Sequence, residues 1–230
     1  MRFHTQGYGD SELGTEQISL RSHVDQAKEA AGVVAGEAGV ERIGFAGIRL
    51  GGTVAALAAD AAGAAGLVAV APAVDGEAYV QWMTKQARLT EVSSGEKTLP
   101  GDPIAELMAR GTLDVLGFPL RREVYEEIRA LDLADALQGF RGDALLLQVS
   151  RTAGPDPALR RLAERLRALG ARADLEVLAD PRALRLGFPR FRRSKDGRKE
   201  DVQGDLTEGV VGAVAAWCRD RRWQAAEVPS

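Results

Sequence analysis

One strand–turn–helix segment constrains the fold of this chain more than any other stretch of its sequence. Residues 42–53 read RIGFAGIRLGGT and continue into an alanine-rich run that ends near Asp60. Gly47 and Gly51 flank Arg49 in the pattern G-x-R-x-G. We expect both glycines to stand where a side chain would collide with the neighbouring strand or helix. The segment therefore predicts a buried strand, a sharp turn centred on Arg49, and a helix that begins at the turn.

This spacing is the frame of a nucleophile elbow, a strained turn that holds one side chain at the N-terminus of a helix. The centre of such a turn normally carries Ser, Cys or Asp, whereas here it carries Arg49. Arginine stays protonated at every accessible pH, so it cannot act as a nucleophile. The segment thus predicts the architecture of an elbow without its reactive group.

The composition is that of an ordinary globular protein and argues against several classes of partner. The chain has 230 residues, of which 45% are hydrophobic and 27% charged, and its formal net charge is −3. This balance gives no reason to expect nucleic acid or a membrane as a partner. We find no apolar run of the roughly 20 residues that span a bilayer, and no apolar secretory segment at the N-terminus. Because the chain has a single cysteine, Cys218, an internal disulfide is excluded and we expect a cytoplasmic protein.

Patterns on both sides of the elbow alternate between strand and helix. Segments that read as strands lie at 42–46, 67–72, 144–149 and 173–178, and the run at 67–72 is of the continuous apolar type expected in a parallel sheet. Segments with a helical period or helical composition lie at 18–36, 52–65, 157–169 and 202–217. This order predicts an α/β fold in which right-handed crossovers build a mostly parallel sheet flanked by helices.

Between Ala73 and Arg141 the alternation breaks, and we expect a helical cap insertion at about 76–141 within a single domain of 1–230. The insertion contains helical patterns at 79–89 and 121–131, a polar loop at 91–97 and an extended piece at 112–120. Two interpretations stand for Trp82, Phe118 and Tyr125: they line a cleft beneath the cap, or they pack its core.

Taken together, the elbow, the cap insertion and the glycine-bounded turn within residues 2–11 resemble the α/β-hydrolase superfamily. More narrowly, three short motifs are similar to hydrolases associated with exosortase systems in bacteria that export polysaccharide. These motifs lie at 47–51, 116–120 and 128–133. The resemblance implies hydrolysis of an ester, thioester or amide, with the backbone N–H of Leu50 as an oxyanion donor and with no cofactor.

The sequence departs from the superfamily pattern at every position that carries its chemistry. Arg49 stands at the nucleophile position. The triad acid is expected at residues 150–152, which are Ser, Arg and Thr, and the nearest carboxylate, Asp156, lies several residues late. The triad histidine is expected after Leu178, yet the only histidines are His4 and His23. Without a nucleophile and a base, the usual two-step acyl transfer has no route.

The superfamily's early strands, with their His-Gly oxyanion motif, are expected upstream of Met1. We therefore expect a sheet that lacks its first strands, and an N-terminally truncated gene product is one explanation. Such a sheet would leave a strand edge that needs covering.

Other residues have ordinary interpretations. The elbow lacks the lysine of a phosphate-binding loop, so a nucleotide site is disfavoured. We interpret His4 and His23 as surface side chains and Cys218 as a buried inert thiol. The basic run over 190–199 fits a solvated loop better than a patch for an acidic polysaccharide or polyphosphate. The sequence has no His/Cys cluster with metal-ligand spacing, so no metal is expected.

Two hypotheses about function follow, an active hydrolase and a catalytically inactive binding or accessory protein linked to polysaccharide export. In the second, Arg49 and Gly51 hold an anionic ligand or a partner, with Trp82 and Phe118 as further contacts. The competing interpretation of Arg49 is that it fills the former pocket and pairs with a carboxylate. The partner expected is an unidentified small molecule or protein, including a homodimer.

Overall fold

The computed structural model describes residues 18–94, 99–115, 118–180, 191–193, 199–201 and 204–221. The chain forms two compact units that are interleaved in sequence. The first comprises Met1–Ile43 and Ala73–Ala136, and the second comprises Gly44–Pro72 and Leu137–Ser230. The second unit contains the predicted parallel sheet and the elbow.

The sheet of the second unit has four strands in the order β1-β2-β5-β6, and every neighbouring pair is parallel. Its strands are β1 (Gly44–Ile48), β2 (Gly66–Val70), β5 (Asp143–Ser150) and β6 (Arg172–Ala179). The central strands β2 and β5 are buried almost throughout, as expected for apolar strands covered on both faces. The predicted mostly parallel sheet is confirmed.

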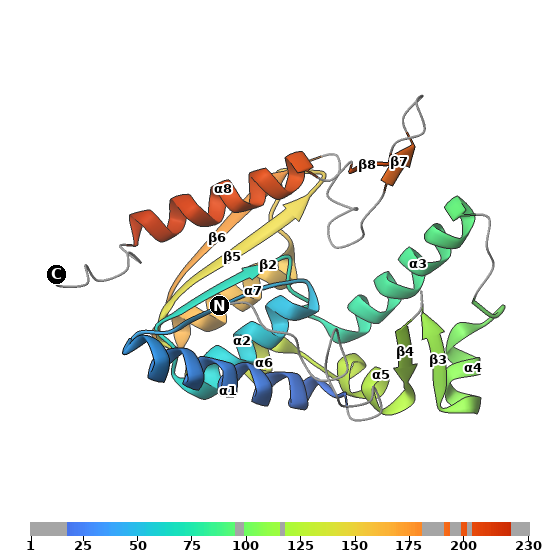
Figure 1. The fold of residues 1–230 in the computed structure, drawn as a ribbon, viewed down its shortest axis with the longest axis horizontal. Helices are drawn as coiled ribbons and strands as arrows, with labels where there is room; N and C mark the ends of the chain where they lie inside the picture. Colours follow the sequence, from blue (N-terminus) through green and yellow to red (C-terminus); the bar gives the residue numbers. More distant parts are fainter. Residues whose placement is uncertain are drawn as a thin grey trace. The chain divides into compact units, whose positions relative to one another are not determined.

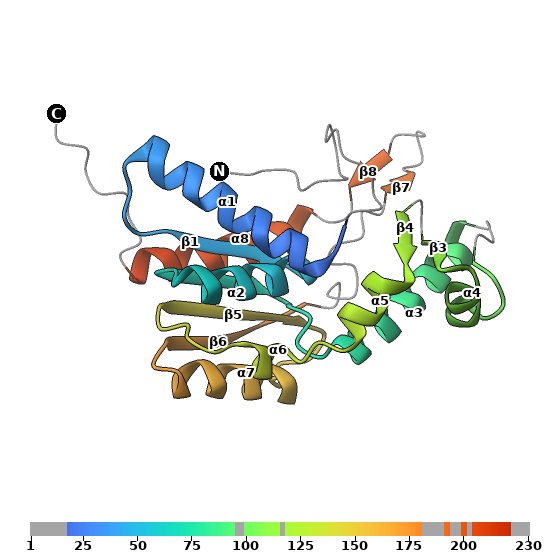
Figure 2. The same ribbon diagram turned by 90° about the horizontal axis from the view of Figure 1, so that it is seen from below.

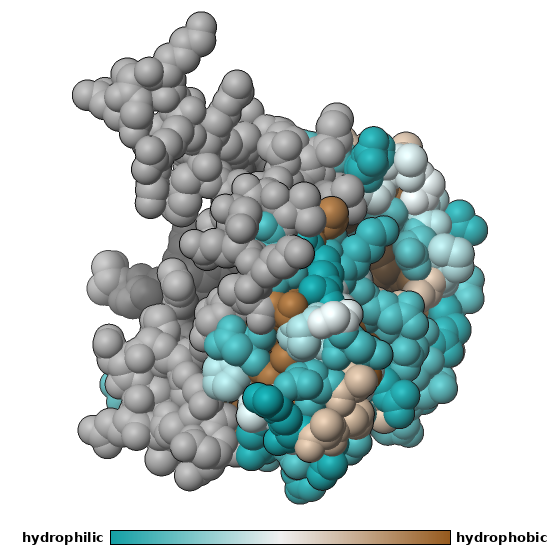
Figure 3. All heavy atoms as spheres, turned by 90° about the vertical axis from the view of Figure 1, so that its right-hand side faces the viewer, coloured by the Kyte–Doolittle hydropathy of each residue, from teal (hydrophilic) through white to brown (hydrophobic). Residues whose placement is uncertain are grey.

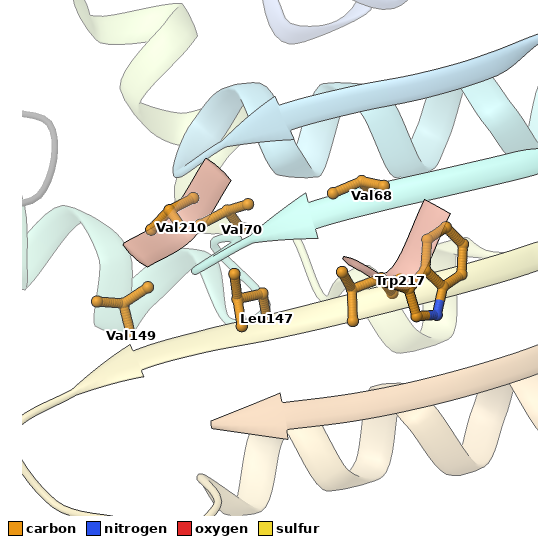
Figure 4. Packing of buried hydrophobic residues seen from close by; sticks show 7 residues of the cluster. Val68, Val70, Leu147, Val149, Val210 and Trp217 are labelled. Atoms are coloured by element: carbon orange, nitrogen blue, oxygen red, sulfur yellow. The ribbon is translucent and has the colours of Figure 1, made fainter. Parts of the chain in front are cut away.

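Helices cover both faces of this sheet (Figure 1). The helix α8 (Gly204–Asp220) lies on one face, where Val210 and Trp217 pack on alternate residues of β2 and β5 (Figure 4). The cluster consists of Val68, Val70, Leu145, Leu147, Val149, Val210 and Trp217. The helices α2 (Leu50–Ala62) and α7 (Pro157–Ala168) lie on the opposite face. The core of the unit is therefore two apolar layers with β2 and β5 between them.

Charged groups fasten the amino ends of β5 and β6. The buried Asp143 accepts two hydrogen bonds from the Arg172 guanidinium, at 2.6 and 2.9 Å. Asp174 accepts the indole N–H of Trp217 at 2.7 Å and also pairs with Arg221. These contacts fix the last turn of α8 to the sheet through polar groups, beside the apolar packing of Trp217.

One carboxylate of α2 organises the chain that leads into β5. The Asp60 side chain accepts the backbone N–H groups of Gln138, Gly139 and Phe140, at 3.1, 2.8 and 2.6 Å. The Phe140 side chain is fully buried. Asp60 thus satisfies three backbone donors that would otherwise need water, and it fixes the entry to the central strand.

The first unit is mostly helical. Its elements are α1 (Leu20–Ala38), α3 (Gly76–Ser94), α4 (Pro103–Arg110), β3 (Thr112–Val115), β4 (Phe118–Arg121), α5 (Arg122–Arg129) and α6 (Leu133–Ala136). The helix α5 packs against α3 and α1. Its Glu127 accepts the backbone N–H groups of Leu20 and Arg21, at 2.7 and 3.1 Å, and so satisfies the start of α1.

Two sequence expectations within this unit are wrong. Residues 112–120 do not form one extended piece, because β3 and β4 pair antiparallel as a hairpin next to α4 and α5 (Figure 2). Residues 91–94 belong to α3 and not to the predicted loop. The helix continues because the carboxylate of Glu91, buried on α3, accepts the Leu99 N–H and pairs with Arg88 at 3.3 Å.

The basic run is described only in part. Phe191–Arg193 and Lys199–Asp201 form a short antiparallel pair, β7 and β8, where a loop was predicted. The remaining residues of the run lie outside the described residues.

The coloured part of the face in Figure 3 is mostly hydrophilic, with hydrophobic side chains in small separate patches. Large hydrophobic residues that stand exposed are Val33, Val40, Ile48, Leu89 and Val211. Within the described ranges, every helix is too short or too polar to cross a membrane.

Candidate functional site

The elbow is formed as the sequence predicts, and its central residue has a strained backbone. Arg49 lies between the end of β1 and the start of α2 with φ 57° and ψ −128°. Its N–H donates to the Val70 carbonyl at 2.9 Å, and its carbonyl accepts from Gly52 and Thr53. Positive φ is unfavourable for a residue with a side chain, so the surrounding turn must impose this conformation.

The glycines around Arg49 do different jobs, which corrects the expectation that Gly47 and Gly51 are equivalent. A Cβ on Gly47 would lie 2.0 Å from the carbonyl oxygen of Gly51, which no real structure tolerates. A Cβ on Gly51 would meet no atom within 4 Å. The second crowded glycine is instead Gly52, where a Cβ would lie 3.1 Å from the Gly47 carbonyl oxygen and 3.3 Å from the Pro72 Cβ. Close approach of β1 to α2 therefore depends on Gly47 and Gly52.

The first turn of α2 presents hydrogen-bond donors beside Arg49. Helix geometry leaves the first N–H groups, those of Leu50 and Gly51, without an acceptor inside the helix. The Arg49 side chain is half-buried and makes no capping hydrogen bond to the helix. A guanidinium and two helix N-terminal N–H groups are a donor set suited to a carboxylate or phosphate.

A second strained residue lies at the same edge of the sheet. Ala71 follows β2 with φ 45°, and its N–H donates to the Leu147 carbonyl at 2.7 Å. Among the described residues, Arg49 and Ala71 are the two non-glycine residues with positive φ. They end neighbouring parallel strands, so the strain gathers at the carboxyl ends, where ligands bind in open α/β sheets. No pattern in the sequence indicates this strain at Ala71.

The position expected for the triad acid is occupied by a structural loop. β5 ends at Ser150. The buried Gln148 side chain donates to the Gly154 carbonyl at 2.9 Å and accepts the Asp156 N–H at 2.7 Å. The Asp156 carboxylate accepts the Ala158 N–H at 2.7 Å, as the N-cap of α7. Asp156 therefore caps α7. Gln148 holds the loop between β5 and α7, and its only signal in the sequence is a polar residue within an apolar strand.

The position expected for the triad histidine follows β6. The Asp180 N–H donates to the Ser150 carbonyl at 2.8 Å, which continues the sheet for one more residue. Residues 181–190 lie outside the described residues, and the sequence has no histidine beyond His23.

One of the two histidines, His23, lies within the described residues. His23 belongs to α1 in the other unit, where burial lowers its pKa below 6.5 and the nearby Glu127 charge opposes that shift. His4 lies outside the described residues. Cys218, on α8, is partly buried, and burial raises its thiol pKa. A raised pKa disfavours the thiolate, in agreement with the inert thiol expected from the sequence.

The aromatic candidates lie in the first unit. Trp82 stacks on Tyr79 one turn earlier in α3, with ring centroids 5.7 Å apart and an interplanar angle of 30°. Phe118 begins β4 opposite Val115, and its side chain lies outside the described residues. Tyr125 is buried in α5, which favours the core-packing interpretation for that residue. The part of the chain that the structure describes holds no cluster of three or more His, Cys, Asp or Glu side chains placed to bind a metal ion.

Comparison with known proteins identifies the fold. No family model matches the chain, and no curated protein matches it by sequence. Among solved structures, it is similar to Est1E from Butyrivibrio proteoclasticus with bound ferulic acid, at 18% identity and a TM-score of 0.52, over 79% of this chain and 70% of that one. It is also similar to the Pyrococcus furiosus esterase PF2001, at 13% identity and a TM-score of 0.53. That match covers 80% of this chain, which spans 61% of the esterase. Both are α/β-hydrolase-fold proteins, so the fold expected from the sequence is confirmed.

Proposed function

We propose that this chain, which has the α/β-hydrolase fold, holds a small anionic molecule at its elbow without hydrolysing it. The observation that carries the proposal is Arg49 at φ 57° and ψ −128°. The elbow keeps its strained geometry while its centre carries a residue that cannot attack a substrate. Strain of this kind costs about 1–3 kcal/mol and gathers at functional sites, so its presence beside a cationic side chain supports a binding role.

The chemistry of the site favours a carboxylate or a phosphate as ligand. A guanidinium offers five N–H donors in a fixed fork and forms charge-assisted pairs with planar oxyanions. The N–H groups of Leu50 and Gly51 add two neutral donors at the positive end of α2. In an enzyme these N–H groups would face the developing oxyanion of an ester or amide; here the same position suits a ligand that already carries the charge.

Hydrolysis of an ester, thioester or amide is the second candidate, and one observation favours it. Leu50 is the first residue of α2, so helix geometry leaves its N–H without an acceptor in the helix, as an oxyanion donor requires. Against it stand Arg49 in place of a nucleophile, Asp156 engaged in capping α7, and a sequence without a histidine after β6. An accessory role in polysaccharide export is a narrower form of the binding proposal, and it rests on the motifs at 47–51, 116–120 and 128–133 alone.

The binding proposal is tested by titrating the purified chain with acetate, benzoate and inorganic phosphate while following its melting temperature and heat of binding. We expect saturable binding of at least one of these anions and a loss of affinity of about tenfold or more in Arg49→Ala, because a charge-assisted hydrogen bond contributes about 1.5–3 kcal/mol. Arg42→Ala is the matched control, since it removes an equal charge at the opposite end of β1. Arg49→Lys keeps the charge but loses the fork, so we expect it to recover only part of the affinity.

A fluorophosphonate probe and a p-nitrophenyl ester assay separate the two candidates. We expect no covalent labelling and no turnover above the buffer rate, in the wild type and in Arg49→Ala alike. Labelling or saturable turnover would establish the hydrolase instead, and the absence of binding to all three anions would refute the binding proposal.

A further inference from the structure

The sheet has two edges of different character. β6, at one edge, carries charged residues along its length, including Arg172, Asp174 and Glu176. β1, at the other edge, reads GFAGI, with no charge and no proline. Natural proteins protect exposed edge strands with charges, prolines or bulges, and β1 has none of these. Among the described residues, only β2 pairs with it.

The backbone of β1 has a defined set of outward-facing groups. In a parallel strand, the hydrogen-bonding groups of successive residues point alternately to the two sides. Because the Arg49 N–H donates to Val70 of β2, the groups of Gly47 and Phe45 also face β2. The N–H and C=O groups of Gly44, Ala46 and Ile48 therefore face the open side. The same three residues are exposed, and Ile48 keeps 48% of its surface accessible.

We propose that this open edge pairs with β1 of a second copy of the chain, antiparallel and about a two-fold axis at Ala46. The outward-facing residues are spaced evenly about Ala46, so the pairing places Gly44 opposite Ile48 at each end and Ala46 opposite itself. Each copy presents the same donors and acceptors, which is what an isologous interface requires. The two sheets of four strands become one continuous sheet.

Charge and side-chain size agree with a second copy as the occupant. β1 carries no charge, so its central pairs bring no like charges together. Glu41 and Arg42, the two residues shortly before β1, have opposite charges. In the proposed pairing they lie near Arg49 of the second copy, where the attraction of Glu41 offsets the repulsion of Arg42. The side chains that the pairing brings together are small at its centre, where Ala46 meets its own copy, and each Ile48 meets a glycine, Gly44.

The geometry of the pairing is tested by disulfide cross-linking of the full chain. In a Cys218→Ala background, Ala46→Cys places two thiols on directly opposite residues, whose Cα atoms are about 5.5 Å apart in an antiparallel pair. That separation lies within the range of about 4.4–6.8 Å that a disulfide spans. Gly44→Cys is the matched control, because its two copies lie four residues out of register, roughly 13 Å apart. Under mild oxidation with copper phenanthroline, we expect covalent dimers from Ala46→Cys and none from Gly44→Cys.

Sedimentation equilibrium tests the association itself. We expect a mass of twice 24.5 kDa for the wild type. Ala46→Pro removes an outward N–H without touching the bonds to β2, and Ile48→Lys adds the charge that protected edges carry. We expect each to raise the dissociation constant at least tenfold, while Ala46→Val, which keeps the N–H, leaves it unchanged. A wild type that stays monomeric, equal cross-linking at positions 44 and 46, or a dimer indifferent to both variants would overturn the proposal. The cross-linking result stands even if Ala46→Pro fails to fold.

Discussion

Alanine substitution at the two glycines of the G-x-R-x-G pattern provides the sharpest test of the elbow geometry. The sequence treats Gly47 and Gly51 alike, whereas the structure separates them. At Gly47 an added Cβ would lie 2.0 Å from the Gly51 carbonyl oxygen, 2.3 Å from the carbon of the same carbonyl and 2.7 Å from the Gly52 nitrogen. At Gly51 it would meet nothing within 4 Å. We therefore expect Gly47→Ala and Gly51→Ala to change stability in opposite directions.

The magnitudes follow from these contacts. Real Cβ atoms stay at 3.0 Å or more from such neighbours, so Gly47→Ala must move β1 and the first turn of α2 apart by about 1 Å. Overpacking of a core by side chains costs about 1–3 kcal/mol. Because the atoms in the way at Gly47 are backbone and cannot rotate aside, we expect a loss near the upper end, about 3 kcal/mol. Gly51 is helical without a positive φ, so alanine there should gain about 0.5–1 kcal/mol.

The assay is urea unfolding followed by far-UV circular dichroism and by tryptophan fluorescence. The two transitions must coincide before a free energy of unfolding is taken, because the chain has two compact units. Gly52→Ala is an internal standard, since its 3.1 Å contact predicts a stability between those of the Gly47→Ala and Gly51→Ala variants. Equal effects at Gly47 and Gly51, or a Gly47→Ala variant as stable as wild type, would refute the elbow geometry.

Three further predictions concern backbone strain at Arg49, the hydrogen bonds of Asp60 and pH. Arg49→Gly should unfold with a free energy about 0.5–2 kcal/mol higher than Arg49→Ala in the same urea assay, because both lose the guanidinium and only glycine accepts φ 57° without strain; an alanine variant of equal or greater stability would contradict this. Asp60→Ala should cost about 1–2 kcal/mol by leaving three backbone N–H groups without their acceptor, and Asp60→Asn should recover part of the loss. Since the pKa of His23 in the fold lies below 6.5, the unfolded chain binds the proton more readily. Stability should therefore be lost as pH falls through about 6.5 and level off below the folded pKa; a melting-temperature series from pH 8 to about 4.5 should show a flatter acid side in His23→Gln than in wild type.

The sheet and its helices were predictable because each carries a strong local pattern. The strand β2 is apolar at every buried position, and β5 is apolar at every buried position except Asp143 and Gln148. The helix α7 has Asp156 and Pro157 at its start and a leucine face toward the sheet. The hairpin β3–β4 was missed because residues 112–120 read as one extended piece, without the Asn-Gly or Asp-Gly pair that marks a two-residue hairpin turn. The end of α3 was missed because Glu91 is satisfied by Leu99, a contact that no local period reveals.

The site was predictable as architecture and less so in its details. The glycine spacing around Arg49 indicates an elbow, since few other turns need small residues on both sides of one position. The spacing does not tell which glycine is crowded, because that depends on how closely β1 approaches α2. The roles of Gln148 and Ala71 could not be predicted from the sequence either, because each role depends on where a neighbouring strand or loop ends. Whether Trp82 serves a ligand stays a prediction.

The pairing of β2 with β5 has a consequence for synthesis of the chain. β2 ends at Val70 and its neighbour begins at Asp143, with most of the other unit encoded between them. Translation at about 5–20 residues per second leaves β2 without that neighbour for roughly 4–15 s. The waiting segment, GLVAV, is fully buried in the finished sheet and has the uncharged, β-branched character of aggregation-prone strands. The nascent chain therefore carries an unpaired, aggregation-prone strand until β5 emerges.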